Sequence, residues 1–186
     1  MSKGRLFVIS GASGVGKSTV LKRVMAARQD LLFSVSATSR PPRAGEQEGV
    51  HYYFVSEEAF RKMIEADELL EYDLHNKTYY GTPRLQLQEK LERGNVVLDV
   101  EPNGAFHVRE ARPDATLIFI MPPSVEELET RLRGRGDTSP EQVALRLERA
   151  RWEMEQRTRY DYVVVNDVVE RCAEEILDII ARHADE

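Results

Sequence analysis

The residues best suited to chemistry form one short stretch near the start of the chain, GASGVGKST at positions 11–19. It fits the pattern G-x-x-x-x-G-K-[ST], in which glycines let several backbone N–H groups and a helix N-terminus face one phosphate. Lys17 adds a mobile positive charge, and Ser18 adds a hydroxyl of the kind that binds Mg²⁺. The predicted phosphate-binding residues are Gly11, Ala12, Ser13, Gly14, Val15, Gly16, Lys17, Ser18 and Thr19.

Arginines form a second group of candidates, because phosphoryl transfer between two anionic substrates needs positive charge around both phosphate groups. Arg40 and Arg43 lie in a loop rich in proline and glycine, whereas Arg131, Arg135 and Arg146 lie around a glycine-interrupted helical segment. An acceptor oxygen that already belongs to a phosphate needs no general base, since positioning and charge neutralisation carry most of the rate. The pattern favours a small-molecule kinase, although a single arginine is more often a solvated surface residue.

Other classes of phosphate-loop protein fit the chain less well. A GTPase usually carries Asn-Lys-x-Asp to read guanine, and here Asn76 and Lys77 are followed by Thr78 and Tyr79. A multi-subunit ATPase usually has a longer domain than this chain of 186 residues. A kinase of a nucleoside monophosphate therefore stays the favoured class.

The elements that must position these residues alternate between strands and helices. Apolar runs at 6–9, 96–100, 116–121 and 162–165 predict buried strands, and apolar residues at helical spacing after position 168 predict a closing amphipathic helix. Such alternation predicts an α/β fold with a central parallel sheet covered on both faces and ligands at the carboxyl ends of the strands. Residues 34–82 break the alternation with short strands and loops, which indicates a small inserted lobe.

Local signals predict several turns and helix ends. Residues 69–72 and 78–80 are expected to pair as a hairpin across Asn76 and Lys77. Thr82 as N-cap and Pro83 at the first helical position predict the start of a helix, and Ser139 with Gln142 three residues later predicts a capping box.

The composition limits the partners. The formal net charge is −6 with no basic tract, which argues against a broad nucleic-acid or anionic-membrane surface. Cys172 is the only cysteine, so the chain fits a reducing compartment and has no Cys-based zinc site. No apolar run approaches the ~20 residues of a membrane span. We expect one cytoplasmic domain without nucleic-acid or membrane contacts, and the sequence carries no signal for its oligomeric state.

Further motifs extend over nearly the whole chain and together are more specific than any one of them. They are FSVS at 33–36, TSRPPRAGE at 38–46, YYFV at 52–55, LEY at 70–72, YYGT at 79–82, PPS at 122–124, RLRGRG at 131–136 and VND at 165–167. In this order they resemble the guanylate kinase family. The resemblance implies Mg²⁺-dependent phosphoryl transfer from ATP to GMP, giving ADP and GDP.

The same resemblance implies how the chain is divided. It suggests a P-loop three-layer sandwich as the core, an inserted GMP-binding lobe and a mobile helical lid. The expected core is residues 1–33, 83–130 and 150–186, the lobe is about 34–82, and the lid is about 131–149.

Site roles are implied residue by residue. The positions that match those holding the GMP phosphate are Ser36, Arg40, Arg43, Tyr52 and Tyr80. Glu71 and Thr82 match positions that read guanine, which fits the chemistry because a carboxylate accepts from both guanine N1–H and its exocyclic amine. Lys17 and Arg40 are expected to be catalytic, together with three arginines that match contacts of the transferring phosphoryl group: Arg131, Arg135 and Arg146. Arg135 and Asn166 are also expected to contact ATP.

Two positions depart from the family pattern. Glu101 stands where the family usually has a second aspartate near guanine and metal, and Asn103 where it has glutamine. We keep Glu101 among the GMP contacts and expect Asp99 to reach, through water, the magnesium ion held by Ser18. The departures leave two alternatives open: a related kinase of another small phosphate acceptor, and a non-catalytic binding module of the same fold.

Overall fold

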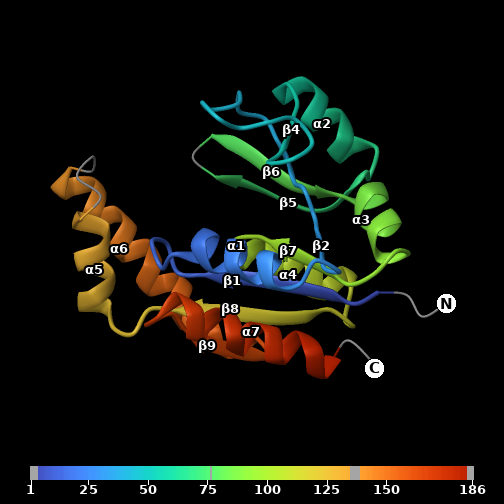
Figure 1. Cartoon of the computed structure of the whole chain (residues 1–186). Helices are drawn as coiled ribbons and strands as arrows, with labels where there is room; N and C mark the ends of the chain where they lie inside the picture. The colour runs from blue at the N-terminus through green and yellow to red at the C-terminus, as the bar shows by residue number, and fades with distance from the viewer. Residues whose placement is uncertain (1–3, 76, 135–138, 184–186) are drawn as a thin grey trace. The chain divides into compact units, whose positions relative to one another are not determined.

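A computed structural model describes residues 4–75, 77–134 and 139–183. The chain divides into two compact units, which are described separately (Figure 1). The first unit comprises Met1–Leu6 and Asp30–Ala115, and the second comprises Phe7–Gln29 and Thr116–Glu186. The second unit contains the phosphate loop, and the first contains the segment expected to form the inserted lobe.

The first unit combines a small sheet with three helices that pack beside it. Its elements are β2 (Leu32–Phe33), β3 (Ala37–Thr38), β4 (Tyr53–Phe54), α2 (Glu57–Glu65), β5 (Leu69–His75), β6 (Thr78–Pro83), α3 (Arg84–Leu91), β7 (Val96–Asp99) and α4 (Pro102–Ala111). The four-stranded sheet has the order β4-β3-β6-β5, while β2 pairs with β7 in parallel. Phe60 of α2 packs with Ala37 and Leu69 in a buried apolar cluster that joins α2 to this sheet.

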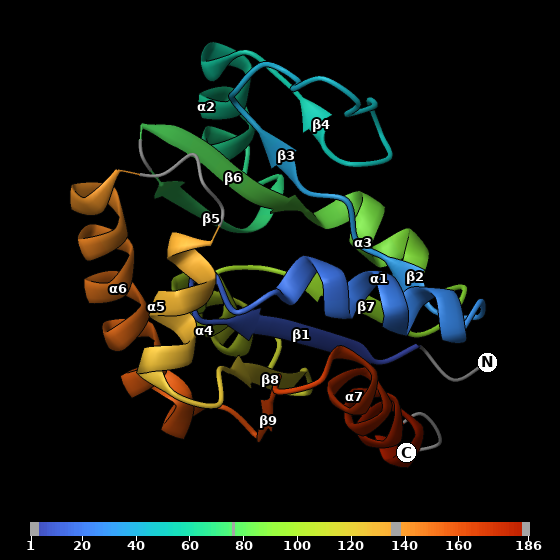
Figure 2. The ribbon, with the colours of Figure 1, turned by 60° about the vertical axis from the view of Figure 1, so that its left-hand side comes forward.

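The second unit is built on parallel strands. Its elements are β1 (Leu6–Gly11), α1 (Lys17–Ala27), β8 (Thr116–Met121), α5 (Val125–Arg133), α6 (Pro140–Glu155), the 3₁₀ helix η1 (Gln156–Arg159), β9 (Tyr162–Val165) and α7 (Val169–His183). β8 lies between β1 and β9 and pairs with both in parallel. α1 packs against α7, and α5 packs against α6 (Figure 2). The predicted α/β class with parallel strands is confirmed.

Local signals explain several helix ends. The side chain of Ser56 accepts the Ala59 N–H and caps α2, and Ser139 and Gln142 form the predicted capping box of α6. The predicted hairpin is confirmed, because β5 and β6 pair antiparallel down to His75 and Thr78.

The predicted start of α3 is wrong. Thr82 does not cap this helix: it lies in β6, and Pro83 stands at the N-cap position. The hydroxyl of Thr82 instead donates to Glu71, a buried acceptor on the neighbouring strand, and this stronger partner explains why the capping pattern misled.

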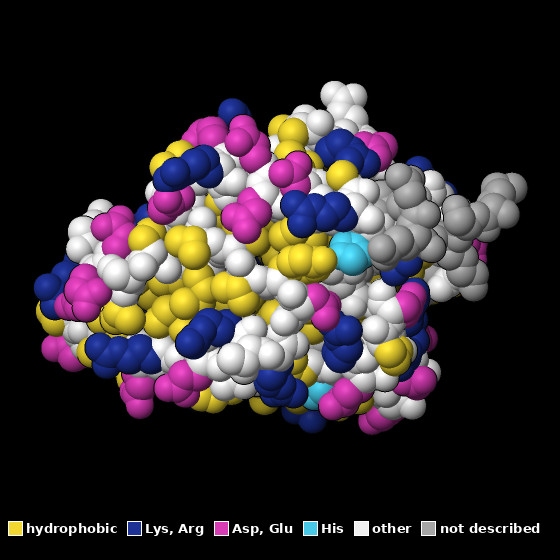
Figure 3. Space-filling model, turned by 90° about the horizontal axis from the view of Figure 1, so that it is seen from below, with side chains coloured by type: hydrophobic (Ala, Val, Ile, Leu, Met, Phe, Trp, Pro, Cys, Tyr) yellow, Lys and Arg dark blue, Asp and Glu magenta, His cyan; other side chains and the backbone are white. Residues whose placement is uncertain are grey.

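The edge strand β9 leaves apolar surface uncovered. Val163 and Val165 are 41% and 45% exposed, although Val164 between them is fully buried. Figure 3 looks onto the side on which β9 and α7 lie and shows hydrophobic side chains gathered there. Among the described residues, no helix has the length and apolar character of a membrane span.

Candidate active site

The phosphate loop connects β1 to α1 in the second unit. Gly14 and Gly16 have φ angles of 84° and 94°, in the left-handed region that favours glycine. A side chain at Gly14 would also collide with α5, because a Cβ there would lie 2.6 Å from Leu132 Cδ2. Both the backbone conformation and the packing of α5 therefore require glycine at this position.

The backbone of the loop is arranged to receive an anion. The Val15 N–H donates to the Ala12 carbonyl at 3.0 Å and closes a tight turn. Within the described residues, the N–H groups of Gly14 and Gly16 donate to no protein oxygen. Gly16 also precedes the first residue of α1, where the helix dipole adds partial positive charge. These groups can bind a phosphate without rearrangement.

Side chains from three other segments hold this loop. Arg131 Nη1 donates to the carbonyls of Val15 at 3.3 Å and of Asn166 at 3.0 Å. Asn166 is buried, and its Nδ2 donates to the same Val15 carbonyl at 2.7 Å. From α6, Glu153 Oε2 accepts the Ser13 N–H at 2.6 Å. The shape of the loop thus depends on residues far away in the sequence.

The remaining residues predicted on the ATP side are placed as follows. Lys17, Ser18 and Thr19 form the first turn of α1, and the latter two are exposed. Arg146 lies on α6 and is exposed. Arg135 lies outside the described residues. Thus Arg131 and Asn166 contact the loop directly, whereas no protein contact of Arg146 is described.

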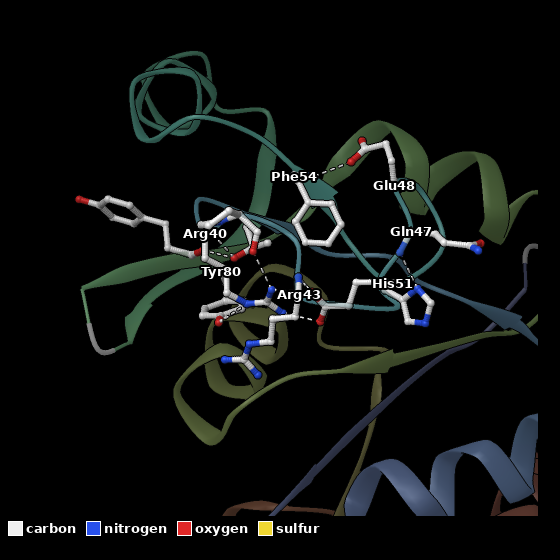
Figure 4. A network of polar contacts seen from close by, with 11 residues as sticks. Arg40, Arg43, Gln47, Glu48, His51, Phe54 and Tyr80 are labelled. Carbon is white, nitrogen blue, oxygen red and sulfur yellow. Dashed lines mark hydrogen bonds and ion pairs between the residues drawn. The ribbon is translucent and has the colours of Figure 1, made fainter.

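Arg40 is held on three sides in the first unit (Figure 4). Its Nη1 and Nη2 donate to Glu46 Oε2 at 2.6 Å and to Oε1 at 2.7 Å, so the two charged groups pair through two parallel bonds. Its Nε donates to the Tyr80 hydroxyl at 3.3 Å. The guanidinium carbon lies 5.0 Å from the centroid of the Tyr52 ring, a cation–π contact. Arg40 is therefore ordered before any ligand binds.

Glu46 also orders the loop around Arg40. The hydrogen bonds from Arg40, followed by the backbone N–H of Arg43, lower the pKa of Glu46 to about 2. The Arg43 N–H donates to Glu46 Oε2 at 2.8 Å, while the Arg43 side chain is exposed. Since the pKa of Arg40 is raised in return, the pair stays charged across the neutral pH range.

Glu71 provides a buried acidic group on the same sheet. Only 6% of its surface is exposed, and Thr82 Oγ1 donates to its Oε1 at 2.6 Å. The pairing of β5 with β6 shifts register between Leu69 and Tyr72, an irregularity that can re-aim a side chain. Burial, opposed by the Thr82 hydrogen bond, raises the pKa of Glu71 to about 7.

Gly104 has no side chain, and the Glu71 carboxylate lies where a side chain at this position would be. A Cβ on Gly104, in the first turn of α4, would lie 2.7 Å from Glu71 Oε2 and 3.3 Å from its Cδ. Glu101 is the N-cap residue of α4, and Asp99 ends β7. Two predicted site residues, Asp99 and Glu101, thus lie in the same unit as Glu71.

The structure places three predicted acceptor-side residues, Glu71, Tyr80 and Thr82, on the two paired strands β5 and β6. Tyr80 and Thr82 are two positions apart on β6, and alternate residues of a strand face the same side. One contacts the arginine and the other contacts the buried acid. Ser36 directly precedes β3, and its carbonyl accepts the Tyr53 N–H at 2.9 Å.

Sequence reasoning gave no role to Glu46, Gly104 or Glu153. Glu46 stands three residues after Arg43 in the arginine-rich motif, so its spacing offered a signal. Gly104 and Glu153 act through contacts with residues distant in the sequence, and neither has a local pattern that would reveal it.

The chain has extensive similarity to known proteins. The sequence model of the family described as "Guanylate kinase" matches residues 3–183. A guanylate kinase of Synechococcus sp. (strain JA-3-3Ab) is 48% identical over 94% of this chain and 81% of its own length. One from Thermus thermophilus is 48% identical over 96% of this chain and 81% of its own.

A solved structure gives the same result. The crystal structure of guanylate kinase from Anaplasma phagocytophilum matches with a TM-score of 0.81 at 33% identity. The match covers 100% of this chain and 88% of the other. The resemblance drawn from the motifs is confirmed.

Glu71→Gln tests whether the Glu71 charge is costly to bury. A pKa of about 7 in the folded state, against 4.5 for an ordinary glutamate, means that the folded chain binds more protons between these values. Stability contributed by this group is therefore present below pH 4.5 and is lost as pH rises towards 7. Glutamine does not titrate and removes that loss. In urea unfolding, the free energy of unfolding of the variant minus that of the wild type should therefore be more positive at about pH 8 than at about pH 5.

The exposed Glu68 serves as the control for this comparison. Glu68→Gln makes the same chemical change at an exposed position and measures the effect of the substitution itself. An equal offset for Glu71→Gln at both pH values would contradict the raised pKa of Glu71.

Proposed function

Since the chain belongs to the guanylate kinase family, we propose that it transfers the terminal phosphoryl group of ATP to GMP, giving ADP and GDP, with Mg²⁺. The observation that carries the proposal is that one strand, β6, contacts both a held arginine and a buried carboxylate: Tyr80 bonds to Arg40, and Thr82 bonds to Glu71. A nucleoside monophosphate has the matching two ends, one an anion and the other a base.

The base end suits guanine. Guanine offers N1–H and an exocyclic amine as neighbouring donors, and both oxygens of the Glu71 carboxylate can accept them. Adenine offers an acceptor at N1, which would face the carboxylate and leave buried polar groups unpaired. Thr82 donates to one carboxylate oxygen and thereby fixes the orientation of the group. We infer that Glu71, Thr82 and Glu101 select guanine.

The phosphate end combines charge with hydroxyl groups. We assign the GMP phosphate to Ser36, Arg40, Arg43, Tyr52 and Tyr80. Glu46 supports this role, because its two bonds to Arg40 fix the plane of the guanidinium. Nη1 also donates to the Pro41 carbonyl at 3.0 Å and Nε to Tyr80, so among the described contacts one N–H of Nη2 is left for a phosphate oxygen. The exposed side chain of Arg43 is available to add a second charge.

The donor end is the phosphate loop. We assign the ATP phosphates to residues 11–19, with Lys17 as the mobile charge and Asn166 as a support of the loop that lies toward the adenine. Arg131, Arg135 and Arg146 would neutralise charge on the transferring group. The attacking oxygen belongs to an already ionised phosphate, so the mechanism needs positioning and charge neutralisation and no general base.

Magnesium fits the donor set of this chain. The described residues contain no group of three or more acidic, histidine or cysteine side chains that could hold a metal ion. This suits Mg²⁺, which keeps several waters and is held mainly by substrate phosphates with few protein ligands. We propose the Ser18 hydroxyl as the direct ligand and Asp99 as a contact through water. When bound, the ion would offset charge on the phosphate oxygens of ATP.

We also propose that residues 34–82 form the GMP-binding lobe and residues 131–149 form a lid on a core made by the rest. Closure of such parts would exclude water, which otherwise hydrolyses the donor. Two alternatives remain. A kinase of another small phosphate acceptor is kept open by Glu101, which replaces the usual aspartate, but Glu71, Tyr80 and Thr82 argue against it. A non-catalytic module would bind without turnover, and the retained Lys17 and Ser18 disfavour it.

A substrate panel tests the proposal. ADP formation from Mg-ATP is measured with GMP, AMP, UMP, CMP and ribose phosphates, with Lys17→Ala as the blank. GMP should exceed the other acceptors on the order of 10⁴-fold in kcat/KM, because a mismatched base leaves buried polar groups unpaired. Turnover of another acceptor in preference to GMP would support the altered-acceptor alternative, and tight nucleotide binding without turnover would support the module.

Gly104→Ala tests the reading of guanine. The added methyl must displace the Glu71 carboxylate, since the Cβ would lie 2.7 Å from Oε2. A displacement of this size should raise the KM for GMP by about 10- to 100-fold and leave the KM for ATP near its wild-type value. The exposed His107 on the same helix gives the control His107→Ala. An unchanged KM for GMP in a folded Gly104→Ala variant would argue against Glu71 as the guanine acceptor.

A further inference from the structure

One carboxylate in the second unit is buried although it has no part in the proposed chemistry. Glu153 lies in the last turn of α6, and none of its surface is exposed. The other buried residues of this helix are apolar: Val143, Leu147, Ala150 and Met154. An apolar residue would fill the position without the cost of desolvating a charge. The acid must therefore be explained by what it binds.

Glu153 binds the phosphate loop. Its Oε2 accepts the Ser13 N–H at 2.6 Å, and its Oε1 accepts Arg149 Nε at 2.6 Å. Bonds to a charged acceptor are shorter and about twice as strong as neutral ones. The contact joins residues 140 positions apart, so α6 constrains the loop from outside it.

The contact holds both sides of one peptide group. The peptide between Ala12 and Ser13 uses its carbonyl to accept the Val15 N–H at 3.0 Å and its N–H to reach Glu153. A planar peptide that is bonded at both ends cannot rotate. The next N–H along the chain belongs to Gly14, which donates to no protein oxygen within the described residues. The orientation of the Ala12–Ser13 peptide therefore determines where the following N–H groups, which face the anion, point.

Arg149 offsets the charge of this arrangement. A carboxylate next to a phosphate loop would repel a bound phosphate if it were unpaired. Arg149 lies one turn earlier on the same helix and forms a salt bridge with Oε1 of Glu153, the oxygen that does not contact the loop. Glu153 can thus accept the loop N–H with limited repulsion of the nucleotide.

We propose that Glu153 is a positioning residue for phosphoryl transfer. It fixes the Ala12–Ser13 peptide so that the following N–H groups of the loop face the phosphates of the donor, and Arg149 screens its charge. The inference rests on the proposed function for the identity of the donor. It assigns a role to a residue that acts through the loop and not through contact with the nucleotide.

The test compares two variants of Glu153. Glu153→Leu fills the space and removes the acceptor of the Ser13 N–H, whereas Glu153→Gln keeps a carbonyl oxygen there and removes the charge. Glu148→Gln is the matched control, because Glu148 is an exposed acid on the same helix. Turnover of Mg-ATP and GMP is measured, Mg-ADP and GMP are titrated separately by calorimetry, and the Ser13 amide proton is followed by NMR.

Glu153→Leu should lower kcat about 10- to 100-fold and weaken Mg-ADP binding, while GMP binding stays at the wild-type value. Glu153→Gln should recover most of the loss. The Ser13 amide proton should resonate at low field in the wild type and in Glu153→Gln, and move to higher field in Glu153→Leu. The Glu148→Gln control should match the wild type in every readout.

Several outcomes would overturn the inference. Wild-type kcat and Mg-ADP affinity in Glu153→Leu would show that the contact has no effect on the loop, and equal losses of ADP and GMP affinity would show a general structural role. If Glu153→Leu does not fold, the NMR spectrum of the wild type decides. A Ser13 amide proton that does not resonate at low field there would overturn the inference. A wild type that fails to phosphorylate GMP would reject the proposed function alone, because the Mg-ADP titrations need no turnover.

Discussion

The structure of the second unit depends on one constraint: backbone N–H groups can bind a phosphate only if they do not already donate to oxygens of the protein. Gly14 and Gly16 meet this constraint with left-handed φ angles. Such a loop makes few internal bonds, so other segments must hold it. Leu132 packs where a Gly14 side chain would be, Asn166 bonds to the Val15 carbonyl, and α6 bonds to Ser13 through Glu153. Helices α5 and α6 thereby support the loop as well as carrying candidate arginines.

The first unit meets a different constraint, the burial of charge. Arg40 and Glu46 solve it by pairing, which leaves both groups charged. Glu71 has no cationic partner among its described contacts, so burial raises its pKa although the Thr82 hydroxyl donates to it. A carboxylate that is poorly satisfied in the free protein has a bonding capacity left for a ligand. This difference separates Glu46, which positions a proposed phosphate-binding arginine, from Glu71, which is itself a proposed binding group.

Much of this could be predicted from the sequence where the cause is local. The phosphate loop, the capping box of α6 and the β5–β6 hairpin follow from residue types at short spacing, and the structure contains them. Thr82 shows the limit, because its local pattern indicated a helix cap while its actual partner lies on another strand. Gly104 and Glu153 have roles that no local pattern indicates, since only tertiary contacts give them a role. The roles of the individual site residues stay predictions, and Arg135 lies outside the described residues.

The central claim is that donor and acceptor are recognised by two separately built clusters, one in each unit. Calorimetric titration of Mg-ADP and of GMP against Lys17→Ala and Glu71→Ala tests this most directly. We expect Lys17→Ala to weaken Mg-ADP binding about tenfold or more and to retain GMP affinity, and Glu71→Ala to do the reverse. A folded variant of either kind that loses affinity for both nucleotides to the same degree would contradict it.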